Sequence, residues 1–327
     1  MTTTDVNAET GMQENPIRSP IGDGGSAMQK ITPNLWFDGN AEDAVTRYTS
    51  LFDDAKIGTI SRYDEASANA SGQPEGSVLT VEFGLEGQAF VALNGGPQFP
   101  FTPAISFIVN CPTRDAVDDL WAHLSPGGEQ LMPLGSYPFS DRYGWTTDEF
   151  GVSWQLIYAD DVPKRKIVPS LMFVGDRCGQ AEEAISFYTS IFDDAEVGAI
   201  ARYGPDQHPD GEGTVMFADF TLCGQRFAAM DSAREHGFDI NESISFIVGC
   251  ANQKEVDYFW EALTADGGEE GQCGWLEDRY GMSWQIVPTL LPELLQDEDA
   301  EKAARVMEAM LKMEKLDIAD LEEAYDR

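Results

Sequence analysis

The chain has 327 residues, of which 42% are hydrophobic, enough to build two domains of ordinary size with a core in each. Its 57 acidic and 21 basic residues give a net charge of −36, and so negative a surface repels nucleic-acid phosphates and anionic lipids. We therefore expect neither nucleic acid nor a membrane as a partner. The acidic residues are spread along the whole chain, which is typical of the acidic proteome of a halophilic, salt-adapted cell.

Residues 1–28 are polar and without hydrophobic periodicity, which predicts a disordered N-terminal arm. They carry neither the basic start nor the apolar centre of a signal peptide, and no run of 18 apolar residues occurs in the chain. We therefore expect a cytoplasmic protein. The five cysteines are odd in number and form no CxxC pair, so neither a disulfide framework nor a zinc knuckle is expected.

The first predicted elements after the arm form a strand, a helix and three further strands. A short β-like run, 31–37, is followed by Asn40, a residue type that can cap a helix. The predicted helix has one apolar face, made of Ala44, Val45, Tyr48, Leu51 and Phe52. Three β-rich stretches follow at 56–63, 78–85 and 88–93, with Glu86-Gly87 as a tight hairpin turn between the last two.

The same order of elements then recurs. A strand with Ile105, Phe107 and Val109 on one face precedes Thr113, which can cap a second helix. The apolar face of that helix carries Val117, Leu120, Trp121 and Leu124. Three more strands are predicted up to residue 157, so residues 29–159 read as one domain of two βαβββ modules.

The rest of the chain repeats this domain. KITPNLWF (30–37) returns as KIVPSLMF (166–173), and FGVSWQLI (150–157) returns as YGMSWQIV (280–287). So long a period indicates a duplicated domain and not a solenoid. We therefore predict a linker at 160–165, a second two-module domain at 166–288, and an α+β fold of four βαβββ modules. Which modules pair with each other stays open.

Residues 289–327 are predicted to form an amphipathic helix and tail. Between Asp299 and Lys315, one helical stripe carries Ala300, Ala303, Ala304, Met307, Met310 and Leu311. Such a stripe must cover apolar surface, either on its own domain or on a sister chain.

The four modules, the opening ITPNLWFDGNAEDA, the block ISFIV and the closing CGWLEDRYGMSWQIVP (273–288) together resemble a known family. This is the PhnB-like branch of the vicinal oxygen chelate superfamily of glyoxalases, bleomycin resistance proteins and dihydroxybiphenyl dioxygenases, often labelled 3-demethylubiquinone-9 3-methyltransferase. The resemblance implies that paired modules curl into half-barrels, each enclosing a ligand-binding cup. It also allows modules to pair within a copy, between copies or between chains, so a homodimer stays open.

The resemblance further implies where the metal ligands of metal-dependent relatives would fall. The His of the first strand falls at Pro33 and Pro169, and the Glu of the last strand at Gln155 and Gln285. Proline has no donor atom, and a neutral amide is a poor ligand for a divalent ion. The acid of the fourth strand in such relatives falls at Asn94 in the first copy and Asp231 in the second. Only Asp231 could coordinate an ion, and one carboxylate cannot hold an ion alone. The three histidines, His123, His208 and His236, are expected on the solvated surface, so we predict no metal.

The residues left as candidates for the two cups are aromatic, amide, hydroxyl or carboxylate. They are Asn94, Trp145, Ser153, Gln155, Asp231, Trp275, Ser283 and Gln285. The glutamines are the best candidates, because strand alternation points them into the cup beside the serines and away from Trp154 and Trp284. Core packing is the competing explanation for the tryptophans, and a turn is the competing role for Asp148 and Asp278.

The favoured hypothesis is a metal-free protein that binds a small molecule and uses no cofactor. The alternative is the activity in the family label, methyl transfer to a quinone precursor. No glycine-rich turn stands between a strand and a helix, so the usual S-adenosylmethionine site is not seen. A metal-dependent lyase, isomerase or dioxygenase is favoured least, because its ligands are missing from both copies.

Overall fold

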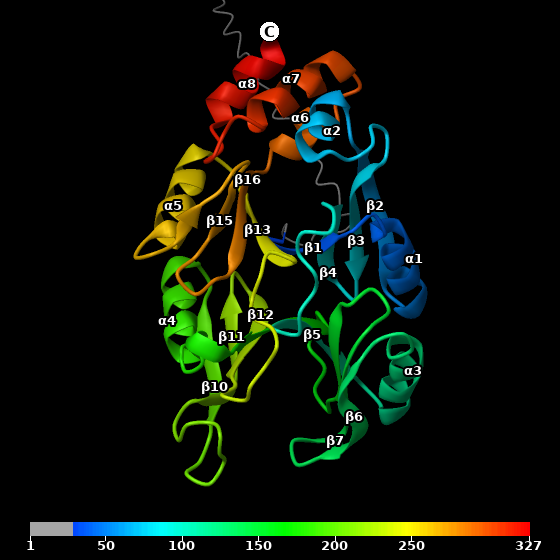
Figure 1. Cartoon of the computed structure of the whole chain (residues 1–327), viewed down its shortest axis with the longest axis vertical. Helices are drawn as coiled ribbons and strands as arrows, with labels where there is room; N and C mark the ends of the chain where they lie inside the picture. The colour runs from blue at the N-terminus through cyan, green and yellow to red at the C-terminus, as the bar shows by residue number, and fades with distance from the viewer. Residues whose placement is uncertain (1–28) are drawn as a thin grey trace, which may run out of the picture.

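The computed structural model describes residues 29–327 of the protein, and the predicted N-terminal arm lies outside the described residues (Figure 1). The elements follow the predicted order closely. The first module holds β1 (Ile31–Phe37), α1 (Ala41–Leu51), β2 (Ala55–Arg62), α2 (Glu65–Ser71), β3 (Val78–Leu85) and β4 (Gln88–Asn94). The second holds β5 (Ile105–Cys111), α3 (Arg114–Leu124), β6 (Gln130–Tyr137), β7 (Ser140–Thr147) and β8 (Ser153–Tyr158).

The second copy repeats both modules. The third module holds β9 (Ile167–Phe173), the short 3-10 helix η1 (Gly175–Arg177), α4 (Ala181–Ile191), β10 (Glu196–Arg202), β11 (Val215–Leu222) and β12 (Gln225–Asp231). The fourth holds β13 (Ile244–Cys250), α5 (Gln253–Thr264), β14 (Glu269–Glu270), β15 (Trp275–Glu277) and β16 (Ser283–Pro288). The duplication of the sequence is therefore a duplication of structure.

The modules are exchanged between the copies. One eight-stranded sheet has the order β14-β15-β16-β13-β1-β4-β3-β2 and joins the fourth module to the first. The other has the order β10-β11-β12-β9-β5-β8-β7-β6 and joins the third to the second. The joints are the antiparallel pairs β1 with β13 and β5 with β9, in which Asn34 faces Ser245 and Ser106 faces Ser170. The structure thus answers the question of pairing that the sequence left open.

Within each copy, the two modules meet through their helix-bearing faces. Tyr48 of α1 is fully buried, and its ring lies 6.3 Å from Phe83 of its own module and 5.3 Å from Trp154 of the next. Tyr188 and Trp284 repeat this contact at 5.6 Å in the second copy. The hydrophobic core therefore lies between modules of one copy, which leaves the opposite face of each sheet free to form a cup.

One of the two predicted helix caps needs correction, and one helix was not predicted. Asn40 stands at the start of α1 but makes no capping hydrogen bond, because the side chain of Asn94 accepts the Ala41 amide proton instead. Thr113 does cap α3, by accepting from the Ala116 amide. The sequence reading also missed α2, whose capping box joins Asp64 and Ser67.

The C-terminal segment forms three helices where one was predicted. They are α6 (Leu291–Leu295), α7 (Ala300–Met310) and α8 (Ile318–Asp326). Leu291, Val306, Leu316 and Leu321 form their buried centre, which also contacts Val287 of β16. Because α7 meets α2 as well, these helices span from the fourth module to the first, at the top of Figure 1. No helix within residues 29–327 is long and apolar enough to cross a membrane.

Candidate functional site

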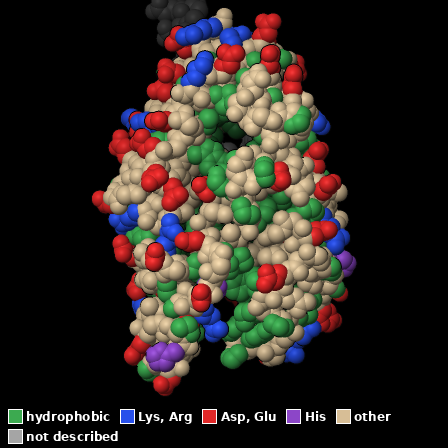
Figure 2. Space-filling view, in the orientation of Figure 1, with side chains coloured by type: hydrophobic (Ala, Val, Ile, Leu, Met, Phe, Trp, Pro, Cys, Tyr) green, Lys and Arg blue, Asp and Glu red, His purple; other side chains and the backbone are tan. Residues whose placement is uncertain are grey.

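The face opposite the helices is concave in the sheet that joins the first and fourth modules. Trp36 of β1 and Trp275 of β15 lie on this face, and their ring centroids are 5.9 Å apart although β13 and β16 separate their strands. The side chains can meet only because the sheet curls towards this face. We call this concavity the first cup. Figure 2 shows the surface hollowed in this half of the molecule, below the C-terminal helices.

A row of polar side chains crosses the floor of the first cup. Asn34 Nδ2 donates to Ser245 Oγ at 3.3 Å, and Gln285 Nε2 donates to the same oxygen at 3.0 Å. Asn34 is 2% exposed and Ser245 is fully buried. Strand register fixes these positions, because Asn34 faces Ser245 across the joint between β1 and β13. The row therefore depends on pairing between the two copies.

Glu82 of β3 continues the row beyond Asn34, on the side away from Ser245 and Gln285. In β3 it is aligned with Val91 of β4, which is aligned in turn with Asn34, so all three share the concave face. A register shift between Ile57 and Ile60 bends β2 next to it, and Thr59 in this bulge hydrogen-bonds the carboxyl group. The second carboxyl oxygen, Oε2, is buried and has no hydrogen-bond partner among the described residues. Burial raises the pKa of Glu82, and the bonds from Thr59 only partly oppose it.

The second cup is the equivalent face of the other sheet, and its glutamine, tyrosine and tryptophan are hydrogen-bonded within it, whereas the buried hydroxyl of Ser170 has no partner among the described residues. Gln155 Nε2 donates to Ser106 Oγ at 2.8 Å, and the Tyr143 hydroxyl donates to Gln155 Oε1 at 2.7 Å. Trp145 Nε1 donates to Ser153 Oγ at 2.8 Å. An apolar cluster made of Ile108, Val168, Ala228 and Ile157 lies beside them.

One difference between the two cups concerns the partner of the glutamine. Trp145 corresponds to Trp275, so Tyr143 corresponds to Cys273, which cannot replace the hydroxyl donor. Within residues 29–327, the amide oxygen of Gln285 consequently accepts no hydrogen bond like the one that Gln155 accepts from Tyr143. The first cup therefore presents an amide oxygen whose equivalent in the second cup already accepts a hydrogen bond.

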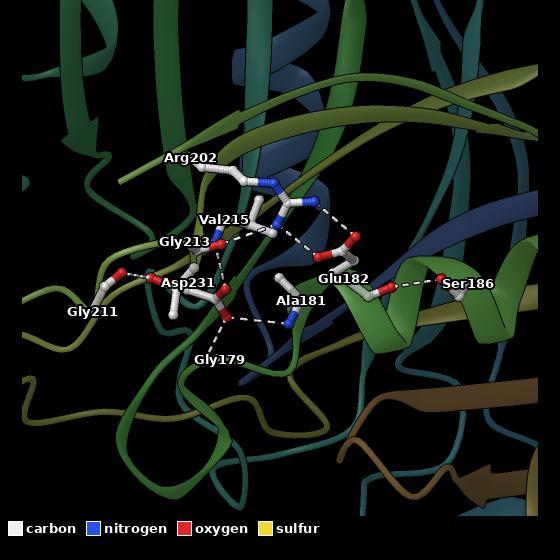
Figure 3. A network of polar contacts seen from close by, with 10 residues as sticks. Gly179, Ala181, Glu182, Ser186, Arg202, Gly211, Gly213, Val215 and Asp231 are labelled. Carbon is white, nitrogen blue, oxygen red and sulfur yellow. Dashed lines mark hydrogen bonds and ion pairs between the residues drawn. The ribbon is translucent and has the colours of Figure 1, made fainter. Parts of the chain in front are cut away.

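Asn94 and Asp231 face the helices and hold backbone in place. Asp231 Oδ1 accepts from the amides of Gly179 at 2.8 Å and Ala181 at 3.1 Å, and its Oδ2 accepts from Val215 at 2.9 Å (Figure 3). Asn94 accepts from Ala41 and donates to the Val78 carbonyl. Both side chains thus tie the start of a helix to neighbouring strands, and the structure does not bring them to the polar rows.

The aspartates of the last turns join the two modules of each copy. Asp148 accepts from the Phe150 and Val152 amides with one oxygen, and from the Tyr48 hydroxyl at 2.7 Å and Trp154 Nε1 at 2.9 Å with the other. Asp278 makes the equivalent bonds to Tyr188 at 2.8 Å and Trp284 at 2.8 Å. Burial is the main cause that raises the pKa of both carboxyl groups. The turn role weighed for these residues is present, with an added role in joining modules.

The positions that a metal would use do not fit one. Pro33 is aligned with Phe246 on the helix-facing side of β1, away from the cup. The described residues contain no group of three or more His, Cys, Asp or Glu side chains close enough to hold an ion. His123 and His208 are exposed as expected, but His236 is half-buried and its Nε2 lies 2.8 Å from Ser232 Oγ. We therefore derive no chemistry through a metal.

Apart from the two cups, a depression with a volume of about 330 Å³ lies between the ends of α1 and α3. Its lining includes Cys111, whose pKa burial raises to about 12, so the thiol stays protonated. Glu86 and Lys166, also in the lining, form an ion pair at 2.5 Å. The thiol is therefore inactive, and the cation of Lys166 is already paired with Glu86.

Sequence reasoning missed Asn34, Trp36 and Glu82. The metal positions of the resembling superfamily fall at Pro33, one residue away from Asn34 in β1, and so do not point to it. A usable signal was present, because Glu82 in VLTVEFGL (78–85) has its repeat counterpart in Asp219 of VMFADFTL (215–222). An acid retained at the same place in two otherwise apolar strands points to a shared role for that position.

Two curled sheets built from exchanged βαβββ modules, each with a cup on its concave face, define a protein of the vicinal oxygen chelate fold. The sequence model of the 3-demethylubiquinone-9 3-methyltransferase family matches residues 29–157 and again residues 165–287. These matches cover more than half of the chain, and the chain belongs to this family.

Solved structures are similar to parts of the chain or to its fold. A PhnB protein from Bacillus cereus, described as a 3-demethylubiquinone-9 3-methyltransferase, is 49% identical over 40% of this chain and 100% of its own, with a TM-score of 0.37. A mutant of glyoxalase I from Zea mays is 12% identical over 80% of this chain and 94% of its own, with a TM-score of 0.50, and shows the fold alone. No curated protein matches the chain.

Proposed function

We propose that the protein binds a small organic molecule in the first cup without the help of a metal ion. The observation that carries this proposal is the row from Glu82 to Gln285, in which a buried carboxyl oxygen has no partner among the described residues. An unpaired buried acceptor costs about 1–3 kcal/mol. A site that keeps such a group is typical of one that a ligand completes.

The exchange of modules makes both copies necessary for this function. We infer that residues 29–159 and 166–288, joined by 160–165, are repeat domains that build each cup together. Glu82 and Asn34 come from the first copy, whereas Ser245 and Gln285 come from the second. The ligand would therefore bridge the duplicated halves of one cytoplasmic chain.

Methyl transfer, the activity in the family name, finds little support in this site. After β1 the chain turns through Asp38, Gly39 and Asn40 into α1, without the glycine-rich turn that binds a nucleotide cofactor. The strand order also differs from the doubly wound parallel sheet on which such cofactors usually bind. Binding without a methyl donor is the simpler conclusion.

A thermal-shift screen tests the proposal. A ligand that binds only the folded state must raise the melting temperature, so we expect small aromatic molecules to do so and S-adenosylmethionine and divalent ions not to. The site is tested with Gly95→Ala, because a Cβ at Gly95 would lie 2.2 Å from the ring of Trp36 and must displace it. Gly237→Ala is the matched control, since a Cβ there meets nothing within 4 Å. A stoichiometric metal, or a shift with S-adenosylmethionine, would contradict the proposal.

A further inference from the structure

The first cup offers a ligand hydrogen-bond acceptors that lack a partner among the described residues. The amide nitrogens of Asn34 and Gln285 each donate one hydrogen to Ser245, which leaves each a second N–H but does nothing for these acceptors. The acceptors that remain within the described residues are the amide oxygen of Gln285 and Oε2 of Glu82. A ligand that donates hydrogen bonds would satisfy these atoms, whereas a ligand made of acceptors would not.

One of these acceptors carries a charge that the protein does not neutralise. Glu82 takes part in none of the ion pairs formed within residues 29–327, and no cationic side chain contributes to its pKa. Thr59 supplies its only described hydrogen bonds. Across β4, Glu82 lies about 10 Å from Asn34, the width of two strand spacings. Val91 lies between the two residues on this face, so the carboxyl group stands apart from the hydrogen-bonded row.

Aromatic side chains form the wall on the same face. Trp36 is held by a hydrogen bond from Nε1 to the Gly96 carbonyl at 2.8 Å, and its ring lies 5.0 Å from Phe99 and 5.9 Å from Trp275. Trp36 and Trp275 are both half-buried, so part of each ring stays accessible from the cup. Aromatic rings attract cations and also bind apolar groups.

The second cup provides an internal comparison. Its acid, Asp219, is one methylene shorter than Glu82, and its Oδ1 accepts from the Ala199 amide at 3.3 Å. Its glutamine is paired with Tyr143, and its floor includes the apolar cluster at Ile108 and Val168. The unpaired carboxyl oxygen found at Glu82 has no counterpart at Asp219.

We propose that the first cup selects a small organic cation, a primary amine or ammonium group attached to an aromatic or other apolar body. The ammonium group donates to Glu82 and the apolar body lies against Trp36 and Trp275. This proposal rests on the small-molecule-binding function and specifies the class of ligand.

The test compares naphthylmethylamine with naphthylmethanol, which has nearly the same shape without the charge. Binding is measured by ligand-observed NMR titration in 0.5 M KCl, because the net charge of −36 attracts cations everywhere and salt screens this general attraction. The wild-type protein is compared with Glu82→Gln and with Glu196→Gln, which removes the same charge from an exposed position at the start of β10.

We expect the amine to bind saturably, with an affinity at least tenfold lower in Glu82→Gln and unchanged in Glu196→Gln. The alcohol should bind more weakly than the amine to the wild type and equally to all three proteins. Equal binding of amine and alcohol, lost in Gly95→Ala, would overturn the cation proposal and leave the binding function standing. Saturable binding of neither probe would overturn both.

Discussion

The indole rings of Trp36 and Trp275 meet edge to face, with 77° between their planes, although the two residues belong to different copies of the repeat. Trp36 is fixed from behind by the loop that leaves β4, where its ring covers Gly95 and its Nε1 bonds to Gly96. This loop leads directly into the second module. The wall of the first cup is therefore set by the chain segment that connects the two sheets.

Gly95→Ala should disturb this wall without touching the polar row. The added Cβ would lie 2.2 Å from ring carbons of Trp36, far inside van der Waals contact, so the indole must leave its position. Overpacking of this kind costs about 1–3 kcal/mol. Urea unfolding followed by tryptophan fluorescence should show this loss, together with a changed native spectrum.

Gly237→Ala is the control for this variant, because Gly237 lies in the corresponding loop of the second copy and an added Cβ there is unhindered. Its unfolding midpoint and native spectrum should match the wild type. A Gly95→Ala protein with wild-type stability and fluorescence would show that Trp36 is not held against this loop.

Asp148→Asn should weaken the joint between the first two modules. The aspartate accepts four hydrogen bonds, and an asparagine would turn an amide group towards the hydroxyl of Tyr48 or the indole N–H of Trp154. Leaving a buried donor unpaired costs about 1–3 kcal/mol. Chemical unfolding should show a loss in this range, and Asp278→Asn should show a similar one in the second copy.

Tyr48→Phe tests whether the loss of stability in Asp148→Asn comes from the hydrogen bond between the modules or from disturbed packing. It removes one donor and leaves the packing of the ring, so a loss of about 1 kcal/mol is expected. Because both residues share one hydrogen bond, the Tyr48→Phe and Asp148→Asn effects should not add in the double variant. Strict additivity would mean that the Tyr48–Asp148 bond does not join the modules.

The repeat made most of the fold predictable. Alternating apolar residues located the strands, helical spacing located α1 and α3, and Glu86-Gly87 located a hairpin whose two residues do adopt positive φ angles. The exchange of modules could not be predicted, because β1 would offer the same apolar edge to β5 as it does to β13. Long-range packing decides which of these strands pairs with β1, and the local periodicity of the sequence carries no information about that packing.

The candidate site was predictable in part. Gln155, Gln285 and the serines beside them lie on the concave faces, as strand alternation predicted. Asn94 and Asp231 were predicted in the cups but bind the backbone at the start of a helix. A side chain at the end of a strand can turn towards a helix in this way, and sequence periodicity does not reveal it. The repeat counterpart Asp219 marks the position of Glu82, but its setting beside a bulge in the neighbouring strand is a tertiary feature that the sequence does not show.

Glu82→Gln should make the protein more stable at neutral pH. Burial raises the pKa of Glu82, so its contribution to stability is complete below the unfolded-state pKa of about 4.3 and is lost as pH rises through the folded-state value. A glutamine resembles the protonated form at every pH. The variant and wild type should unfold alike near pH 4, with the variant more stable by about 1 kcal/mol at pH 8.

The measurement is urea unfolding at a series of pH values, with Glu196→Gln as the exposed control. The difference between that control and the wild type should change little with pH. A Glu82→Gln variant that loses stability as pH rises would mean that the protein provides Glu82 with a favourable partner, and the cup would then have no charge left for a ligand.

The melting temperature of the wild-type protein should rise with KCl concentration. A net charge of −36 repels itself across the folded surface, and the unfolded chain relieves this repulsion by expanding. Raising KCl from about 0.1 M to 1 M shortens the screening distance from about 10 Å to about 3 Å, which weakens repulsion between all but neighbouring charges. Sucrose at matched osmolality serves as the control, because it has no charge and cannot screen. A melting temperature that stays flat in KCl, or that rises equally in sucrose, would show that the acidic surface is not an adaptation to salt.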